Sequence, residues 1–166
     1  MRITLRFRKH RFGFSHYTVT DVTGVNSKVD DDLHICMWDF DNQPLESIID
    51  ALLLVQHHYC LPRIFILRTN EKSNYQAFSL TRRPFKAVVV IIIETFLVDW
   101  NFWKLGVLRG FFTLRTSPKF NCKPKLVKVL QSKYMDECTL RQLKCWTRYE
   151  TVDDRGNAQN GREKEN

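Results

Sequence analysis

The chain has 166 residues and is 43% hydrophobic, so it can bury one good core, and a single domain is the expectation. Its longest purely apolar run, residues 87–93, is far shorter than the ~20 residues of a membrane-spanning helix, which excludes a transmembrane segment. The five cysteines are scattered without the spacing of a zinc site and indicate reduced thiols. We therefore expect a soluble protein of the cytoplasm.

The formal charge of +8 comes from 26 Lys and Arg against 18 Asp and Glu, and it is unevenly distributed. Residues 1–11 contain five basic residues and no acid, whereas residues 21–50 contain eight acids and one lysine. Residues 104–150 contain eleven basic residues against three acids. An acidic region between basic regions suits a polyanion on the basic surface with cations at the acidic point.

Alternating, β-branched segments predict strands, and longer segments with apolar residues three or four apart predict helices. In chain order these are strands at 2–7 and 33–40, a helix at 42–59, strands at 63–68 and 75–80, a helix at 84–97, a strand at 109–117, and two short basic helices at 123–134 and 139–150. Residues 8–32 are expected to form a loop or hairpin. Residues 151–166 are expected to be a disordered polar tail, which leaves residues 1–150 as one domain.

The two central helices rest on different signals. Asp41 or Asn42 can cap the first, whose early turn contains Pro44. The second is so rich in Val and Ile that propensity alone favours a strand, but its length and its place in the order favour a helix. From residue 33 the order is β-α-β-β-α-β, an α+β fold with an RNA-recognition-motif-like core. An N-terminal β extension and the C-terminal basic helices would flank this core.

The sequence "WDFDN" at residues 38–42 places two carboxylates at the end of a predicted strand. Residues i and i+2 of a strand point to the same face, about 6.6 to 6.8 Å apart, so Asp39 and Asp41 should project together. Adjacent carboxylates repel each other unless a cation lies between them, and Mg²⁺ or Mn²⁺ is the cation that such oxygens favour. The simpler alternative is one acid at a strand end and one acid that caps the following helix.

A third acid, Asp99, precedes the predicted strand "RGFFTLRTSPK", which carries several basic residues. In this order of elements the chain resembles the archaeo-eukaryotic primase superfamily, the primase-polymerases common in plasmids and viruses. That family begins its catalytic unit with an hhDhD strand, seen here as "ICMWDFD", and later has a further acid and a basic strand. The resemblance covers roughly residues 33–120.

The resemblance implies that Asp39, Asp41 and Asp99 are the catalytic metal ligands, holding two Mg²⁺ or Mn²⁺ ions and a nucleoside triphosphate. It further implies that phosphates are bound by Arg68, Lys72, Arg115 and Lys119. Where the family has a His on the second hairpin strand, this chain has Gln76, which can donate a hydrogen bond but carries no charge and moves no proton. This difference puts catalytic activity in doubt.

The implied function is nucleotidyl transfer on a single-stranded DNA template, as in the DNA replication of a mobile element or virus inside its host cell. Nucleic acid is expected to contact the basic residues Arg109, Lys123, Lys125 and Lys128. A replicative helicase or another replication protein is the implied protein partner.

Two other function classes stay open. "RGFFTL" partly resembles the RNP1 motif, whose exposed aromatic residues stack on bases, so the chain could bind single strands without chemistry. Phe111 and Phe112 are adjacent, however, so one of them should point into the core. The aromatic residues Trp100, Phe102 and Trp103 are also expected to pack rather than bind bases. The small size also allows a structural adaptor of a replication complex.

Overall fold

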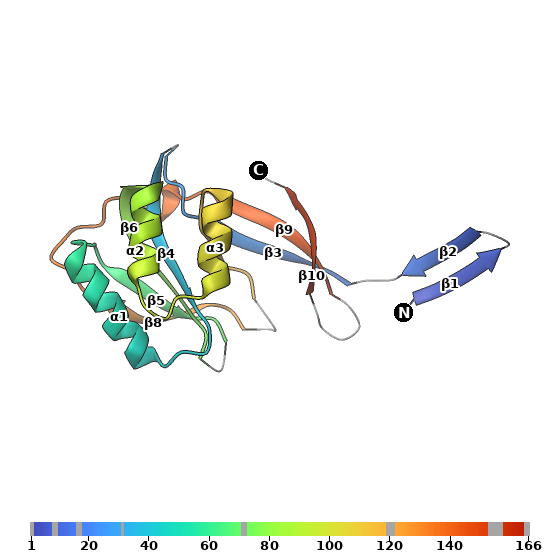
Figure 1. The fold of residues 1–166 in the computed structure, drawn as a ribbon, viewed down its shortest axis with the longest axis horizontal. Helices are drawn as coiled ribbons and strands as arrows, with labels where there is room; N and C mark the ends of the chain where they lie inside the picture. Colours follow the sequence, from blue (N-terminus) through green and yellow to red (C-terminus); the bar gives the residue numbers. More distant parts are fainter. Residues whose placement is uncertain are drawn as a thin grey trace.

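The computed structural model describes residues 2–7, 10–15, 18–30, 32–70, 73–118, 122–152 and 158–164 (Figure 1). These residues form antiparallel sheets and three α helices, so the prediction of an α+β protein is confirmed. Among these residues, no helix has the length and apolarity that crossing a membrane requires.

The central sheet contains the predicted strands on either side of the first helix. Its strands, in spatial order, are β4 (Leu33–Phe40), β6 (Tyr75–Pro84), β5 (Ile64–Arg68) and β8 (Lys125–Leu130). Every neighbouring pair is antiparallel. Helix α1 (Leu45–His58) connects β4 to β5, so β6 is inserted between two strands that are consecutive in the chain.

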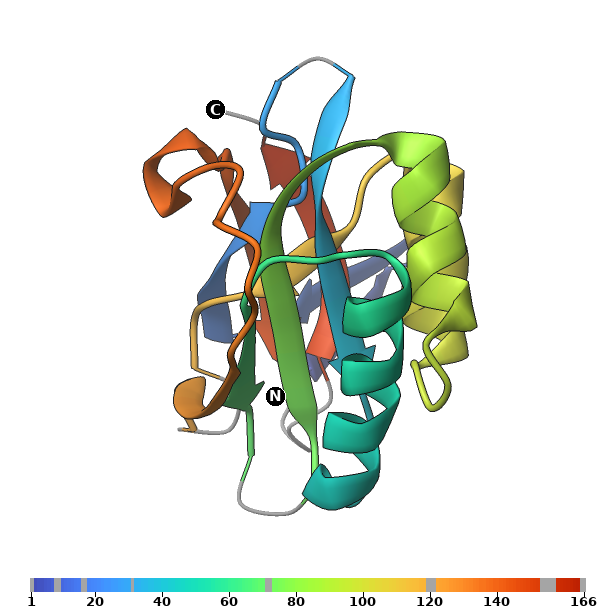
Figure 2. The ribbon, with the colours of Figure 1, turned by 90° about the vertical axis from the view of Figure 1, so that its left-hand side faces the viewer.

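Two helices pack their apolar faces against this sheet and a third lies beside them (Figures 1 and 2). In α2 (Phe85–Glu94), Val88, Ile91 and Ile92 are buried at spacings of three and four residues, which confirms the helix that the element order favoured over propensity. Helix α3 (Trp100–Arg109) contacts α2 and was not predicted.

A second antiparallel sheet lies alongside the first. It consists, in spatial order, of β10 (Ala158–Lys164), β9 (Cys145–Val152), β3 (Thr18–Asn26) and β7 (Thr113–Arg115). The remaining strands, β1 (Arg2–Phe7) and β2 (His10–Ser15), pair with each other and lie apart from the rest of the chain in Figure 1.

The predictions for the last third of the chain were largely wrong. The predicted strand at 109–117 is only three residues long, because α3 extends to Arg109 and ends at Gly110, whose φ of 77° requires a left-handed conformation. The short strand β7 pairs with β3 instead of joining the central sheet.

The two predicted basic helices are strands β8 and β9, with a short 3₁₀ helix at Leu140–Gln142 between them. The β8 sequence KLVKVL fits the two-residue period of a strand as well as the helical period, and its pairing with β5 makes it a strand. The polar segment predicted to be a disordered tail contains the end of β9 and all of β10, which pair with each other.

Candidate functional site

The two carboxylates of "WDFDN" lie at the end of β4 and face one cavity. Asp39 pairs in register with Gln76 of β6, and the Asp41 carboxylate accepts a hydrogen bond from Asn74 Nδ2 at 2.6 Å. The prediction that Asp41 or Asn42 caps α1 was wrong, because the N-cap residue is Pro44 and α1 has no side-chain capping hydrogen bond at its N-terminus. Asp41 is thus oriented by the β5–β6 turn and not by the helix.

Asp99 is joined to the same strand end by its backbone. Its N–H donates to the Asp39 carbonyl at 2.9 Å, which fixes the start of α3 against the end of β4. The Asp99 carboxylate accepts a hydrogen bond from the Phe102 N–H at 2.6 Å, and so caps α3.

One cavity of about 460 Å³ brings together all three of the predicted catalytic residues. Its walls include all three carboxylates, Asp39, Asp41 and Asp99, together with Gln76 and Arg115. The same walls contain residues that the sequence analysis did not single out, namely Asn70, Asn74, Asn101, Thr113 and Ser117. The only sequence signal for the first two was a polar turn between two strands.

Arg115 contributes a fixed positive charge to this cavity. Its Nε donates to Ser117 Oγ at 3.1 Å, and a terminal nitrogen donates to the Pro118 carbonyl at 2.7 Å. Ser117 is in turn bonded to Thr23 of β3 through its backbone N–H and its hydroxyl. The guanidinium is therefore positioned by the loop after β7, a site suited to binding an anion beside the carboxylates.

Gln76 occupies the position beside Asp39 in the sheet, and it is only 8% exposed. Among the described residues, its Oε1 is buried without a hydrogen-bond partner. A buried acceptor left without a donor costs roughly 1 to 3 kcal/mol, which a bound donor or cation would recover.

A second, basic cavity of about 350 Å³ adjoins the acidic one. It is lined by Arg68, Lys123 and Lys125, and it shares Asn70 and Cys122 with the acidic cavity. Three of the residues predicted to bind phosphates or nucleic acid therefore lie together beside the carboxylates.

The other predicted basic residues are placed differently. Lys128 is exposed on β8 but lines neither cavity. Arg109 is at the C-terminal end of α3, about 15 Å along that helix from Asp99. Lys72 and Lys119 lie outside the described residues.

The donor set fits a hard divalent cation. Carboxylate oxygens are ligands that Mg²⁺ and Mn²⁺ prefer, and three carboxylates line this cavity, so no soft ligand is needed. In the described part of the chain no three Asp, Glu, His or Cys side chains converge into a ready-made metal cage. Mg²⁺ commonly binds through one or two carboxylates and completes its coordination shell with water and substrate phosphates. Asp39 and Asp41 could supply those carboxylates.

The aromatic residues do not form an exposed base-stacking pair in "RGFFTL". Phe112 is buried, as expected for one of two adjacent residues, and its ring contacts those of Phe85 and Phe102. Phe111 is half-buried beneath the Lys28 amine. Trp100 is 58% exposed and stacks on the ring of its neighbour Trp103.

Comparisons with models of protein families, with curated proteins and with solved structures found no match to this chain.

Proposed function

We propose that this chain is a metal-dependent nucleotidyltransferase of the primase-polymerase type, acting on single-stranded DNA in the replication of a mobile element or virus. The observation that carries the proposal is the single cavity in which Asp39, Asp41 and Asp99 lie with Gln76 and Arg115. Apart from the Asp39 and Asp41 pair, these residues are far apart in the sequence, and a purely structural role for each would not require them to share a cavity.

The finer fold assignment is part of the same proposal. We infer an RNA-recognition-motif-like core from the spatial order β4-β6-β5 and from α1, which connects the outer two of these strands. The main departure from that arrangement concerns its last strand, which should pair with the first. Here β7 contacts β4 but is hydrogen-bonded to β3. The fourth strand of the central sheet is instead β8, beside β5.

In this proposal Asp39 and Asp41 hold the cation, with Asp99 beside them. When bound, the cations would activate the attacking hydroxyl and stabilise the leaving pyrophosphate. Arg115 would bind phosphate oxygens of the nucleotide, since a forked guanidinium suits that charge. Arg68, Lys123 and Lys125 would bind the phosphates of the nucleic acid that extends from the site.

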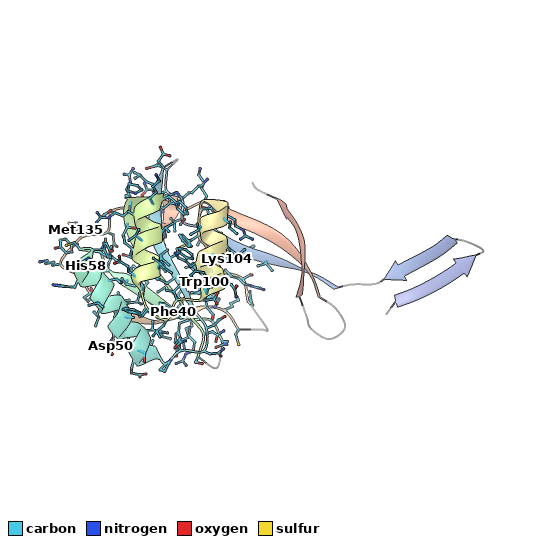
Figure 3. The ribbon with its side chains drawn as sticks, in the orientation of Figure 1. Phe40, Asp50, His58, Trp100, Lys104 and Met135 are labelled. Carbon is cyan, nitrogen blue, oxygen red and sulfur yellow. The ribbon has the colours of Figure 1, made fainter. Side chains whose placement is uncertain are left out.

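The direct test is incorporation of a labelled nucleotide on a single-stranded DNA template with Mg²⁺ or Mn²⁺. The Asp39→Asn/Asp41→Asn variant should lose incorporation by at least about a hundredfold, because amides bind such cations poorly. Asp50→Asn is the matched control, since Asp50 is an exposed carboxylate on α1 (Figure 3) that does not line the cavity. Equal incorporation by the double variant and the control would contradict the proposal.

A second candidate function, single-strand binding without chemistry, is favoured by one specific observation. Gln76 stands beside Asp39 where the resembled family has a His, so this position carries an amide, which transfers no proton. Under this alternative the wild type would incorporate nothing. It would still bind single-stranded DNA, with an affinity that falls linearly in log[salt] by about 0.7 per phosphate contact.

A further inference from the structure

A third cavity, of about 370 Å³, lies between the central sheet and the second sheet. From the central sheet it is lined by Ile35, Met37, Leu67, Gln76 and Phe78, and from the covering segments chiefly by Val25, Leu114 and Leu143. Its wall is therefore largely apolar, with Gln76, Arg115 and Thr116 as its polar residues. We refer to it as the apolar cavity.

The apolar cavity and the acidic cavity share two polar residues. Gln76 and Arg115 line both, so these side chains stand at the boundary between an acidic, cation-binding space and an apolar space. The strand register explains this arrangement, because Asp39 pairs with Gln76 and, two residues earlier, Met37 pairs with Phe78. One face of β4 and β6 thus changes from polar to apolar at Gln76.

Gln76 also carries the buried oxygen that has no partner among the described residues. The side chain is more than nine-tenths buried, so water is largely excluded from it. A buried acceptor at the mouth of an apolar cavity requires a ligand that presents an N–H or O–H group beside an apolar body. A hydrocarbon would leave the oxygen unsatisfied, and inorganic phosphate would not match the apolar wall.

We propose that the apolar cavity binds the base of the nucleotide whose phosphates lie in the acidic cavity, and that Gln76 Oε1 accepts a hydrogen bond from a base N–H. This inference rests on the proposed function. A nucleobase is planar, has apolar faces and carries N–H groups at its edge, and the volume is within the range of small-molecule sites. Phe78, whose ring is held against that of Phe65 with centroids 4.9 Å apart, supplies an aromatic surface in the wall.

The proposal assigns Gln76 a role other than that of the family His. Instead of binding phosphate, its amide would bind the base, and so distinguish a ligand that carries a base from one that does not. Inorganic tripolyphosphate, which carries the phosphates alone, should therefore bind more weakly than ATP, and adenosine should bind measurably without any cation.

The test uses titration calorimetry on the full chain and compares ATP and tripolyphosphate in the presence of Mg²⁺ with adenosine in its absence. In Gln76→Leu, which keeps the size but removes the acceptor, ATP affinity should fall about five- to twentyfold while tripolyphosphate affinity stays the same. The unfolding temperature of this variant should not decrease, because an unsatisfied buried group has been removed.

A second pair of variants tests occupancy of the cavity. Leu143→Trp enlarges a half-buried side chain in the wall and should weaken adenosine and ATP binding but not tripolyphosphate binding. Leu54→Trp, at an exposed position of α1 that lines neither cavity, is the control. If wild-type ATP and tripolyphosphate bind equally, the base site is wrong while the nucleotide site stands. If neither binds, the proposed function and this inference both fall.

Discussion

Trp38 shows how a single side chain fixes the strand that carries the carboxylates. Its indole is fully buried on the helix-facing side of β4, and its Nε1 donates to Thr95 Oγ1 at 2.9 Å. The same Thr95 hydroxyl donates to the Ile91 carbonyl at the end of α2. Because side chains alternate along a strand, anchoring Trp38 to the helices turns its neighbour Asp39 toward the cavity.

His34, at the other end of β4, predicts a pH dependence of stability. It is buried, with Nδ1 2.8 Å from Ser27 Oγ, and burial, assisted by the nearby Lys28 amine, lowers its pKa from 6.5 to about 4. Between pH 6.5 and 4, His34 therefore binds a proton in the unfolded chain but not in the native state. The stability that the neutral His34 contributes should be fully present above pH 6.5, and the free energy of unfolding should fall by up to about 1.4 kcal/mol per pH unit below that pH.

The measurement is urea unfolding at pH 7.5 and at pH 4.5 for the wild type and for His34→Gln. The wild type should lose more stability than the variant over this interval, since carboxylates titrate in both proteins and cancel in the comparison. His57→Gln, at an exposed position of α1, should behave like the wild type. An equal loss in all three proteins would show that His34 is protonated in the native state.

Helix α3 is the element on which the site depends and which the sequence analysis missed. Its first residue follows Asp99, which caps it, and it ends at Gly110. The aromatic residues at its start and the Gly inside it both weakened the helical signal. Its placement depends on packing, because a Cβ added at Gly106 would lie 2.2 Å from the ring of the buried Phe112.

Gly106→Ala should therefore destabilise the protein, although alanine is the better helix former. Propensity alone would add roughly 0.5 to 1 kcal/mol of stability, whereas overpacking against the Phe112 ring costs roughly 1 to 3 kcal/mol. The prediction is a net loss in the free energy of unfolding, measured by urea denaturation. In a Phe112→Leu background the same change should cost less, and an equal cost there would rule out the clash as its cause.

At the scale of the whole molecule, the sequence predicted β4, β5, β6 and α1 because their hydrophobic period was unambiguous. Helix α2 was predicted from its length and its place in the order of elements, against its Val- and Ile-rich composition. Strand β8 was misassigned because KLVKVL fits both periods, and only its neighbour β5 decides between them.

The candidate site divides in the same way. The Asp-x-Asp pattern and the order of elements led to a cavity that contains Asp39, Asp41, Asp99, Gln76 and Arg115. The apolar cavity could not be predicted, because its walls come from segments as distant as Val25, Phe78 and Leu143, which only tertiary structure brings together. Asn74 was missed because nothing in a polar turn shows which carboxylate it will bind.

The central claim is that Asp39 and Asp41 hold a divalent cation, and the most direct measurement is a Mn²⁺ titration in which the signal of the free ion is followed by electron paramagnetic resonance. The wild type and the Asp50→Asn control should take up the ion equally, with an affinity that increases when ATP is present. In Asp39→Asn/Asp41→Asn the affinity should fall at least tenfold while the protein stays folded. Equal uptake by the double variant and the wild type would contradict the account.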